Sequence, residues 1–198
     1  MVDFITNASP STFNGFSYNV NIKKRTMDII LEKAREILTP GYLKTLITEH
    51  GNTQVSERKY IDTFKSILDD LGYTYTEASS QQPKDFRNIN GIGLNIEMKK
   101  TDTFTIYFND TLPNEDTEYI ILFTGKEYAT QNNIEPQMIH VNGDYFPNSS
   151  EDWVYEYAEK LEVLKNEYAR GDSARNLSGW MSVYPRPTYK AKIRQLIL

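Results

Sequence analysis

The sequence predicts an α/β (α+β) fold in which a mixed central β-sheet is flanked by helices. Apolar residues recur at helical spacing over residues 26–38 and 56–71, which is typical of amphipathic helices. Apolar and polar residues alternate over residues 94–100 and 103–108, as they do in half-buried strands. The continuously apolar run 119–123 predicts a central strand that is buried on both faces. Helices and strands in this order are expected to pack as helical layers on a mixed sheet.

Composition indicates one globular domain without cysteine chemistry. A chain of 198 residues, 39% hydrophobic and 13% aromatic, is long enough to bury a full core. The absence of cysteine excludes disulfides, thiolate zinc sites and cysteine nucleophiles, and the presence of only two histidines excludes a histidine-rich metal site. No apolar run reaches the roughly 20 residues that span a bilayer, and the polar start lacks the features of a signal peptide. We therefore expect a cytoplasmic protein with no membrane partner.

The N-terminal part predicts an irregular arm followed by two helices. Residues 1–24 are rich in Asn, Ser and Thr and have no sustained period, although a short strand is a candidate at 16–20. The segment Thr39-Pro40-Gly41 is expected to end the amphipathic helix over 26–38. A second, short helix is expected over 42–49.

The third predicted helix, over residues 56–71, leads towards the sheet. Ser56 is a candidate N-cap and Gly72 a candidate stop. Glu57 precedes Ile61 by one helical turn and so lies at the head of the apolar stripe. An acid in this position either meets a partner on the inner side or complements the helix dipole from the first turn.

A predicted β-hairpin, which follows a strand at 72–76, carries the candidate chemistry. The Asn and Gly residues of 88–93 suit a chain reversal that brings Asp85 beside Glu97. Lys99 shares a strand face with Glu97 because side chains alternate with a period of two. Converging carboxylates repel each other unless a cation lies between them, and Mg²⁺ prefers oxygen ligands of this kind. The hairpin therefore predicts a magnesium site with an amine alongside, which suits phosphoryl-transfer chemistry.

This arrangement resembles the PD-(D/E)XK nuclease superfamily, and most closely its type II restriction endonucleases. The resemblance rests on Pro83, on Asp85, and on the acid-x-Lys pair formed by Glu97 and Lys99. In this chain Lys84 separates the proline from the first acid, whereas the family has the two adjacent. The resemblance implies a restriction-endonuclease-like sheet with two covering helical layers.

The resemblance also implies a role for each hairpin residue. Asp85 and Glu97 would hold Mg²⁺, with the backbone carbonyl of Met98 as a further ligand, and Glu57 matches the position of an additional acid. Lys99 would orient or deprotonate the attacking water, or stabilise charge on the phosphate. The implied substrate is double-stranded DNA, cut at a short specific sequence by a homodimer to leave a 5′-phosphate and a 3′-hydroxyl. The alternative is an exposed strand on which Glu97 and Lys99 form a surface pair of little energetic value.

Recognition of DNA is expected from the second half of the single domain 1–198, in which residues 56–123 form the catalytic core and 124–198 the recognition and dimerisation elements. The segment 124–144 is rich in side-chain amides, which pair with adenine in the major groove, so we expect A·T pairs in the site. Within it, Asn142-Gly143 is expected to form the turn of a further hairpin. The alternative is a polar surface loop. The residues expected to contact DNA are Arg87, Asn88, Lys126, Gln131, Asn132, Asn133, Gln137, Asn142, Arg175, Arg186 and Lys190.

The last part of the chain is basic although the formal net charge of the protein is -5. Residues 173–198 contain no acid, so we expect this tail to contact DNA phosphates. The alternative is a final helix over 190–198 that leaves its cations in solvent. The preceding segment, 152–168, has apolar residues at helical spacing and forms either part of the core or a dimer face.

Three other functions fit the same residues. A repair or junction-resolving nuclease of the same superfamily would select DNA by its structure. A non-catalytic DNA-binding protein would bind in the presence of Mg²⁺ without forming product. An interaction protein would carry the acid-x-Lys pair by chance.

Overall fold

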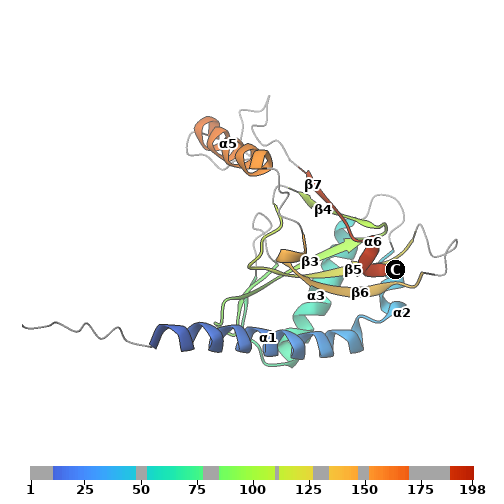
Figure 1. Cartoon of the computed structure of the whole chain (residues 1–198). Coiled ribbons are helices and arrows are strands. Elements are labelled where there is room, and N and C mark those ends of the chain that lie inside the picture. The colour runs from blue at the N-terminus through green and yellow to red at the C-terminus, as the bar shows by residue number, and fades with distance from the viewer. Residues whose placement is uncertain are drawn as a thin grey trace, which may run out of the picture.

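The computed structural model describes residues 11–47, 53–77, 85–109, 112–126, 134–146, 152–169 and 188–198. Its centre is a five-stranded sheet in the order β1-β2-β3-β5-β6 (Figure 1). The five strands are β1 (Thr76–Glu77), β2 (Phe86–Ile89), β3 (Leu94–Thr101), β5 (Glu118–Phe123) and β6 (Gln137–Asn142).

The sheet is mixed, because β3 and β5 run parallel while the other neighbours are antiparallel. Strand β5 lies between β3 and β6, and its residues from Tyr119 to Phe123 are all buried. Consecutive side chains of a strand point to opposite faces, so a strand without exposed positions must be covered on both. The prediction of a central, doubly buried strand is therefore confirmed.

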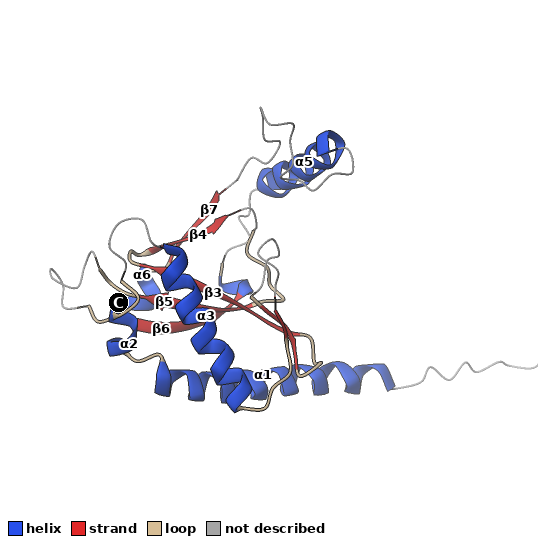
Figure 2. Cartoon of the chain, turned by 180° about the vertical axis from the view of Figure 1, so that it is seen from behind, coloured by secondary structure: helices blue, strands red, loops and turns tan. Residues whose placement is uncertain are grey.

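Helices cover one face of the sheet. They are α1 (Ser11–Ile37), α2 (Pro40–Lys44) and α3 (Thr53–Asp70), and Figure 2 shows α3 crossing in front of the strands with α1 below it. Their apolar stripes form one core cluster with the sheet, which includes Phe64 of α3, Phe86 of β2 and Ile96 of β3. A mixed sheet flanked by helices is thus present, as the sequence predicts.

Three helix boundaries differ from the predicted ones. The expectation of an irregular arm with a strand at 16–20 is wrong for residues 11–24, which belong to α1. Helix α3 begins at Thr53, so Ser56 lies inside it, buried, and does not cap it. The second helix ends at Lys44. Gly72 does end α3, with φ of 69°, and the Tyr73 N–H bonds back to the Leu68 carbonyl over 2.9 Å.

The opposite face of the sheet is covered by a two-stranded ribbon. Strands β4 (Thr105–Asn109) and β7 (Thr188–Lys192) pair with each other in a separate sheet. The prediction of a strand at 103–108 is confirmed, but this strand, β4, does not join the central sheet. Its inner side chains build a second core cluster with β5 and β6, whose members are Ile106, Phe108, Tyr119, Ile121, Phe123, Ile139, Val141, Phe146, Ala191 and Ile193. This face therefore carries strands where the resemblance implies a second helical layer.

The C-terminal elements also differ from expectation. The segment 190–198, for which a helix was the alternative, is a strand up to Lys192, followed by the short α6 (Arg194–Ile197). No hairpin turn forms at Asn142 and Gly143, because β6 leads into a 3₁₀ turn, η1 (Gly143–Tyr145). A Cβ at Gly143 would lie 1.9 Å from the Asn114 carbonyl oxygen, so only glycine fits this approach.

Helix α5 (Asp152–Ala169) stands apart from the central sheet (Figure 1). Leu161 is buried, whereas Tyr157 and Leu164 are about half exposed, at 49% and 50%. The expectation that these apolar positions pack into the core is therefore wrong for the latter two. Within the described part of the chain, no helix is long and apolar enough to cross a membrane.

Candidate active site

The β2–β3 hairpin is shaped by its Asn and Gly residues. Asn88, Asn90, Gly91 and Gly93 all have positive φ, between 51° and 70°, which Asn and Gly tolerate best. The Asn88 side-chain oxygen accepts a hydrogen bond from the Gly93 N–H at 2.8 Å. The predicted chain reversal is therefore confirmed, and Asn88, expected to contact DNA, uses this oxygen to close the turn.

Asp85 stands at the start of the hairpin and is bound to the facing strand. Its Oδ2 atom accepts a hydrogen bond of 2.7 Å from the Met98 N–H. Burial, reinforced by the negative charge of Glu97, raises the pKa of Asp85 to about 7, although the Met98 hydrogen bond and Lys99 lower it. Asp85 and Glu97 therefore lie within electrostatic reach of each other, as the hairpin predicts.

Glu97 and Lys99 lie on the same face of β3. Lys99 Nζ is 2.5 Å from Glu97 Oε1, and the two side chains are only 20% and 12% exposed. This is a half-buried pair, which excludes the exposed surface pair considered above. Lys99 Nζ also lies 5.3 Å from the centre of the Phe108 ring, so β4 covers the amine from above the sheet.

The neighbouring Lys100 points to the other face and has a different partner. Its Nζ atom lies 3.2 Å from Asp102 Oδ1, and the same oxygen accepts a hydrogen bond from Thr124. The alternation of the strand thus separates two adjacent lysines, and only Lys99 accompanies Glu97.

Tyr60 of α3 also belongs to this site, which sequence reasoning missed. It is buried, and its pKa is raised by burial and then by the negative charges of Glu57, Asp85 and Glu97. Its phenol therefore stays protonated. Its place on the helix, three residues after Glu57, could have indicated this.

Glu57 lies at the edge of the site. Its side chain is exposed rather than turned inward, but its charge contributes to the raised pKa of Asp85. Among the described residues, no three His, Cys, Asp or Glu side chains are close enough to hold a metal ion. Glu57 therefore does not close a ligand set with Asp85 and Glu97, and a metal here would rest on two carboxylates and backbone or water oxygens.

The chemistry of the two carboxylates fits a divalent cation. Both are largely buried, and part of the upward shift in the pKa of Asp85 comes from the charge of Glu97. A cation between them would relieve this repulsion and take the place of the hydration that burial removes. The Met98 carbonyl, between Glu97 and Lys99 in the chain, offers a hard oxygen ligand of the kind that Mg²⁺ accepts.

Three of the residues expected to contact DNA make hydrogen bonds within the fold. The Gln137 amide donates to the Ile197 carbonyl at 3.3 Å. The Asn142 amide donates to Glu118 at 3.1 Å, while its oxygen caps η1 by accepting from the Asp144 N–H at 2.9 Å. Arg87 donates to the Glu77 carbonyl at 3.4 Å. Gln137 and Asn142 therefore each use an amide N–H in a contact within the fold, and base contacts by these two residues stay a prediction.

Of the remaining residues expected to contact DNA, Lys126 and Lys190 are exposed. The others, together with Pro83 of the motif, lie outside the described residues: Gln131, Asn132, Asn133, Arg175 and Arg186.

Comparisons with protein-family models, with curated proteins and with solved structures found no match for this chain. The candidate site therefore stands on its own geometry: two acids and one lysine on a β-hairpin, with a tyrosine from the adjoining helix.

Proposed function

We propose that this chain is a magnesium-dependent endonuclease that hydrolyses phosphodiester bonds of double-stranded DNA at a short specific sequence, as a type II restriction enzyme does. One observation carries the proposal. The Met98 N–H holds Asp85 at the mouth of a hairpin whose facing strand presents Glu97 and Lys99 on one side. This arrangement resembles that of the PD-(D/E)XK nucleases, except that Lys84 separates Pro83 from Asp85 in this chain.

The oxygen ligands and the lysine would have different roles in the reaction. Asp85, Glu97 and the Met98 carbonyl are the oxygen ligands that would hold Mg²⁺. When bound, Mg²⁺ lowers the pKa of water and neutralises charge on the phosphate. Lys99 is a cation fixed beside Glu97, in position to orient the attacking water or to stabilise the growing negative charge. Hydrolysis with departure of the 3′ oxygen leaves a 5′-phosphate and a 3′-hydroxyl.

The test is cleavage of unmethylated phage DNA by the purified protein in Mg²⁺, compared with EDTA. We expect discrete bands that require Mg²⁺, and a loss of at least about 100-fold in Asp85→Asn, Glu97→Gln and Lys99→Gln, because each removes a charge that acts in the transition state. Lys100→Gln is the matched control, since Lys100 lies on the opposite strand face. Melting curves verify that each variant is folded.

Three results would contradict the proposal: cleavage that persists in EDTA, site variants that cut like the wild type, or a loss of activity in Lys100→Gln equal to that in Lys99→Gln. Cleavage of branched but not linear duplexes would favour a repair or junction-resolving enzyme. Tight binding of DNA without product would favour a non-catalytic protein.

A further inference from the structure

The β4–β7 ribbon has two chemically different faces. In its register Tyr107 faces Lys190, and Ile106 faces Ala191. Ile106, Phe108 and Ala191 are buried against the central sheet. Because side chains alternate along each strand, Tyr107, Lys190 and Lys192 lie on the outer face. The ribbon is thus apolar beneath and polar above.

The outer face carries positive charge and an aromatic ring. Lys190 and Lys192 are exposed, and Tyr107 retains 48% of its surface accessible. Lys190 Nζ lies 5.7 Å from the centre of the Tyr107 ring. Neither β4 nor β7 contains an acidic residue, so no carboxylate on the ribbon offsets these charges. Local charge of this kind steers polyanions even when the whole molecule is acidic.

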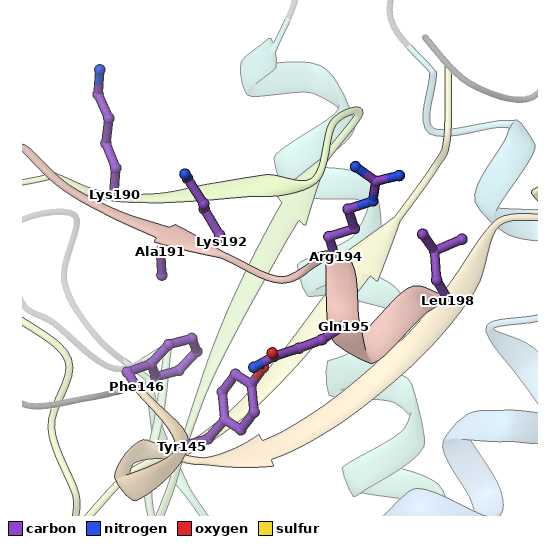
Figure 3. Close-up of a pocket in the computed structure, with 8 residues that line it drawn as sticks. All are labelled: Tyr145, Phe146, Lys190, Ala191, Lys192, Arg194, Gln195 and Leu198. Atoms are coloured by element: carbon purple, nitrogen blue, oxygen red, sulfur yellow. The ribbon is translucent and has the colours of Figure 1, made fainter.

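Lys190, Lys192 and Arg194 form a ridge of three cations, which lies beside a groove and does not encircle it. Figure 3 shows Lys190, Lys192 and Arg194 pointing to one side, with Tyr145 and Phe146 on the other side of β7. The groove has a volume of about 640 Å³ and its lining is mainly apolar. A small anion inside it would not meet the three charged ends. The geometry instead suits an extended polyanion that lies across the ridge.

The ribbon that carries the ridge covers the candidate active site with its inner face. Phe108, on the underside of β4, lies 5.3 Å from Lys99 Nζ, measured from its ring centre. The thickness of the ribbon, about 10 Å for packed sheets, separates a duplex on the outer face from Lys99. The duplex would reach the hairpin only beyond the edge of the ribbon, and ten base pairs extend about 34 Å.

We propose that the outer face of the ribbon is a docking surface for the phosphate backbone of duplex DNA, with Lys190 and Lys192 as its phosphate contacts and Arg194 extending the same ridge. This surface rests on the proposed nuclease function, and it places the duplex without reading its sequence. The partner is a double-stranded polyanion, because the three cations point away from the groove and present their charge along the outside of the ribbon, where a compact anion would not meet all three.

The experiment measures binding of a fluorescent duplex oligonucleotide by anisotropy at several salt concentrations, with Ca²⁺ replacing Mg²⁺ to prevent turnover. The ribbon variant is Lys190→Gln with Lys192→Gln. The matched control is Lys33→Gln with Lys44→Gln, which removes one partly buried and one exposed charge from the helical layer on the opposite face. A second variant, Lys190→Arg with Lys192→Arg, preserves the charge. Wild-type cleavage in Mg²⁺ is measured in parallel.

We expect the ribbon variant alone to lower the slope of log affinity against log salt by up to about 1.8, or about 0.9 for each phosphate that the protein no longer neutralises. The control and the arginine variant should match the wild type. If the wild type cleaves DNA but the ribbon variant keeps the wild-type salt slope, the proposed docking surface is wrong and the proposed nuclease function is retained. If the wild type neither binds nor cleaves duplex DNA, both proposals fail.

Discussion

At Asp85 the fold disfavours the charged carboxylate that the proposed metal site requires. Its pKa is about 7 in the folded protein because of burial and the charge of Glu97, whereas an unfolded aspartate titrates near 3.8. Between these values the unfolded chain has released the proton that the folded chain still holds. Without metal, this group therefore lowers stability as pH rises from about 4 to about 7, and the loss is complete above pH 7.

We predict that Asp85→Asn stabilises the metal-free protein at pH 8. The amide can still accept from the Met98 N–H and carries no charge, so the penalty disappears. The gain is at most about 4 kcal/mol, because one pKa unit corresponds to about 1.4 kcal/mol. Urea unfolding in EDTA at pH 4 and pH 8 measures it. A variant that gained as much at pH 4 as at pH 8 would show that the charge of Asp85 is not the cause.

At the level of single residues, the sequence predicted what local geometry determines. Glu97, Lys99 and the turn at Asn88 follow from alternation and from backbone conformation, both of which are local. The partners of Gln137 and Asn142 depend on segments far along the chain, such as Ile197 and Glu118. The sequence near Gln137 or Asn142 does not show which group its amide contacts, because the partner is distant in the chain.

At the level of elements, the type of each strand was predictable but its neighbour was not. The alternation of 103–108 identified β4 correctly, yet its partner β7 lies about 80 positions later in the chain. The extension of α1 to Ser11 was missed because propensity in residues 11–24 is weak. A helix already formed adds residues without a new nucleation step, which lets it continue through a poor sequence.

We predict that the two faces of β4 respond differently to truncation. Phe108→Ala should lower the free energy of unfolding by about 3–5 kcal/mol, because the ring is buried against Tyr119 and Phe146 and its removal leaves a cavity. Tyr107→Ala, on the outer face, should lower it by less than about 1 kcal/mol. Chemical denaturation of both variants checks the difference. Equal losses would mean that the ribbon does not pack on the sheet in this way.

At the scale of the whole molecule, the described part of the chain presents one candidate hairpin. One site makes one cut, so cleavage of both strands requires two copies or two binding events. The proposed working unit is a homodimer, and the partly exposed Tyr157 and Leu164 of α5 are candidates for its interface.

We predict that conversion of supercoiled plasmid to linear DNA depends on protein concentration more steeply than nicking does. Sedimentation velocity with a cognate duplex in Ca²⁺ should report two chains per duplex. Tyr157→Glu with Leu164→Glu should increase the nicked fraction if α5 forms the interface, whereas Lys160→Glu is the control for added charge on the same helix. Linearisation that stays first order in a strictly monomeric protein would contradict the dimer.

The pairing of β4 with β7 also has a consequence for biosynthesis. A ribosome synthesises β3, with Glu97 and Lys99, well before β7, which lies near the end of the described residues. Strand β4 therefore waits for its partner, since Asn109 pairs with Thr188. Until then β4 lacks its only strand partner among the described elements, and its buried face has no complete cover. The nascent chain therefore contains the proposed catalytic residues before it contains the proposed docking surface, so on this proposal DNA would be bound firmly only after β7 has left the ribosome.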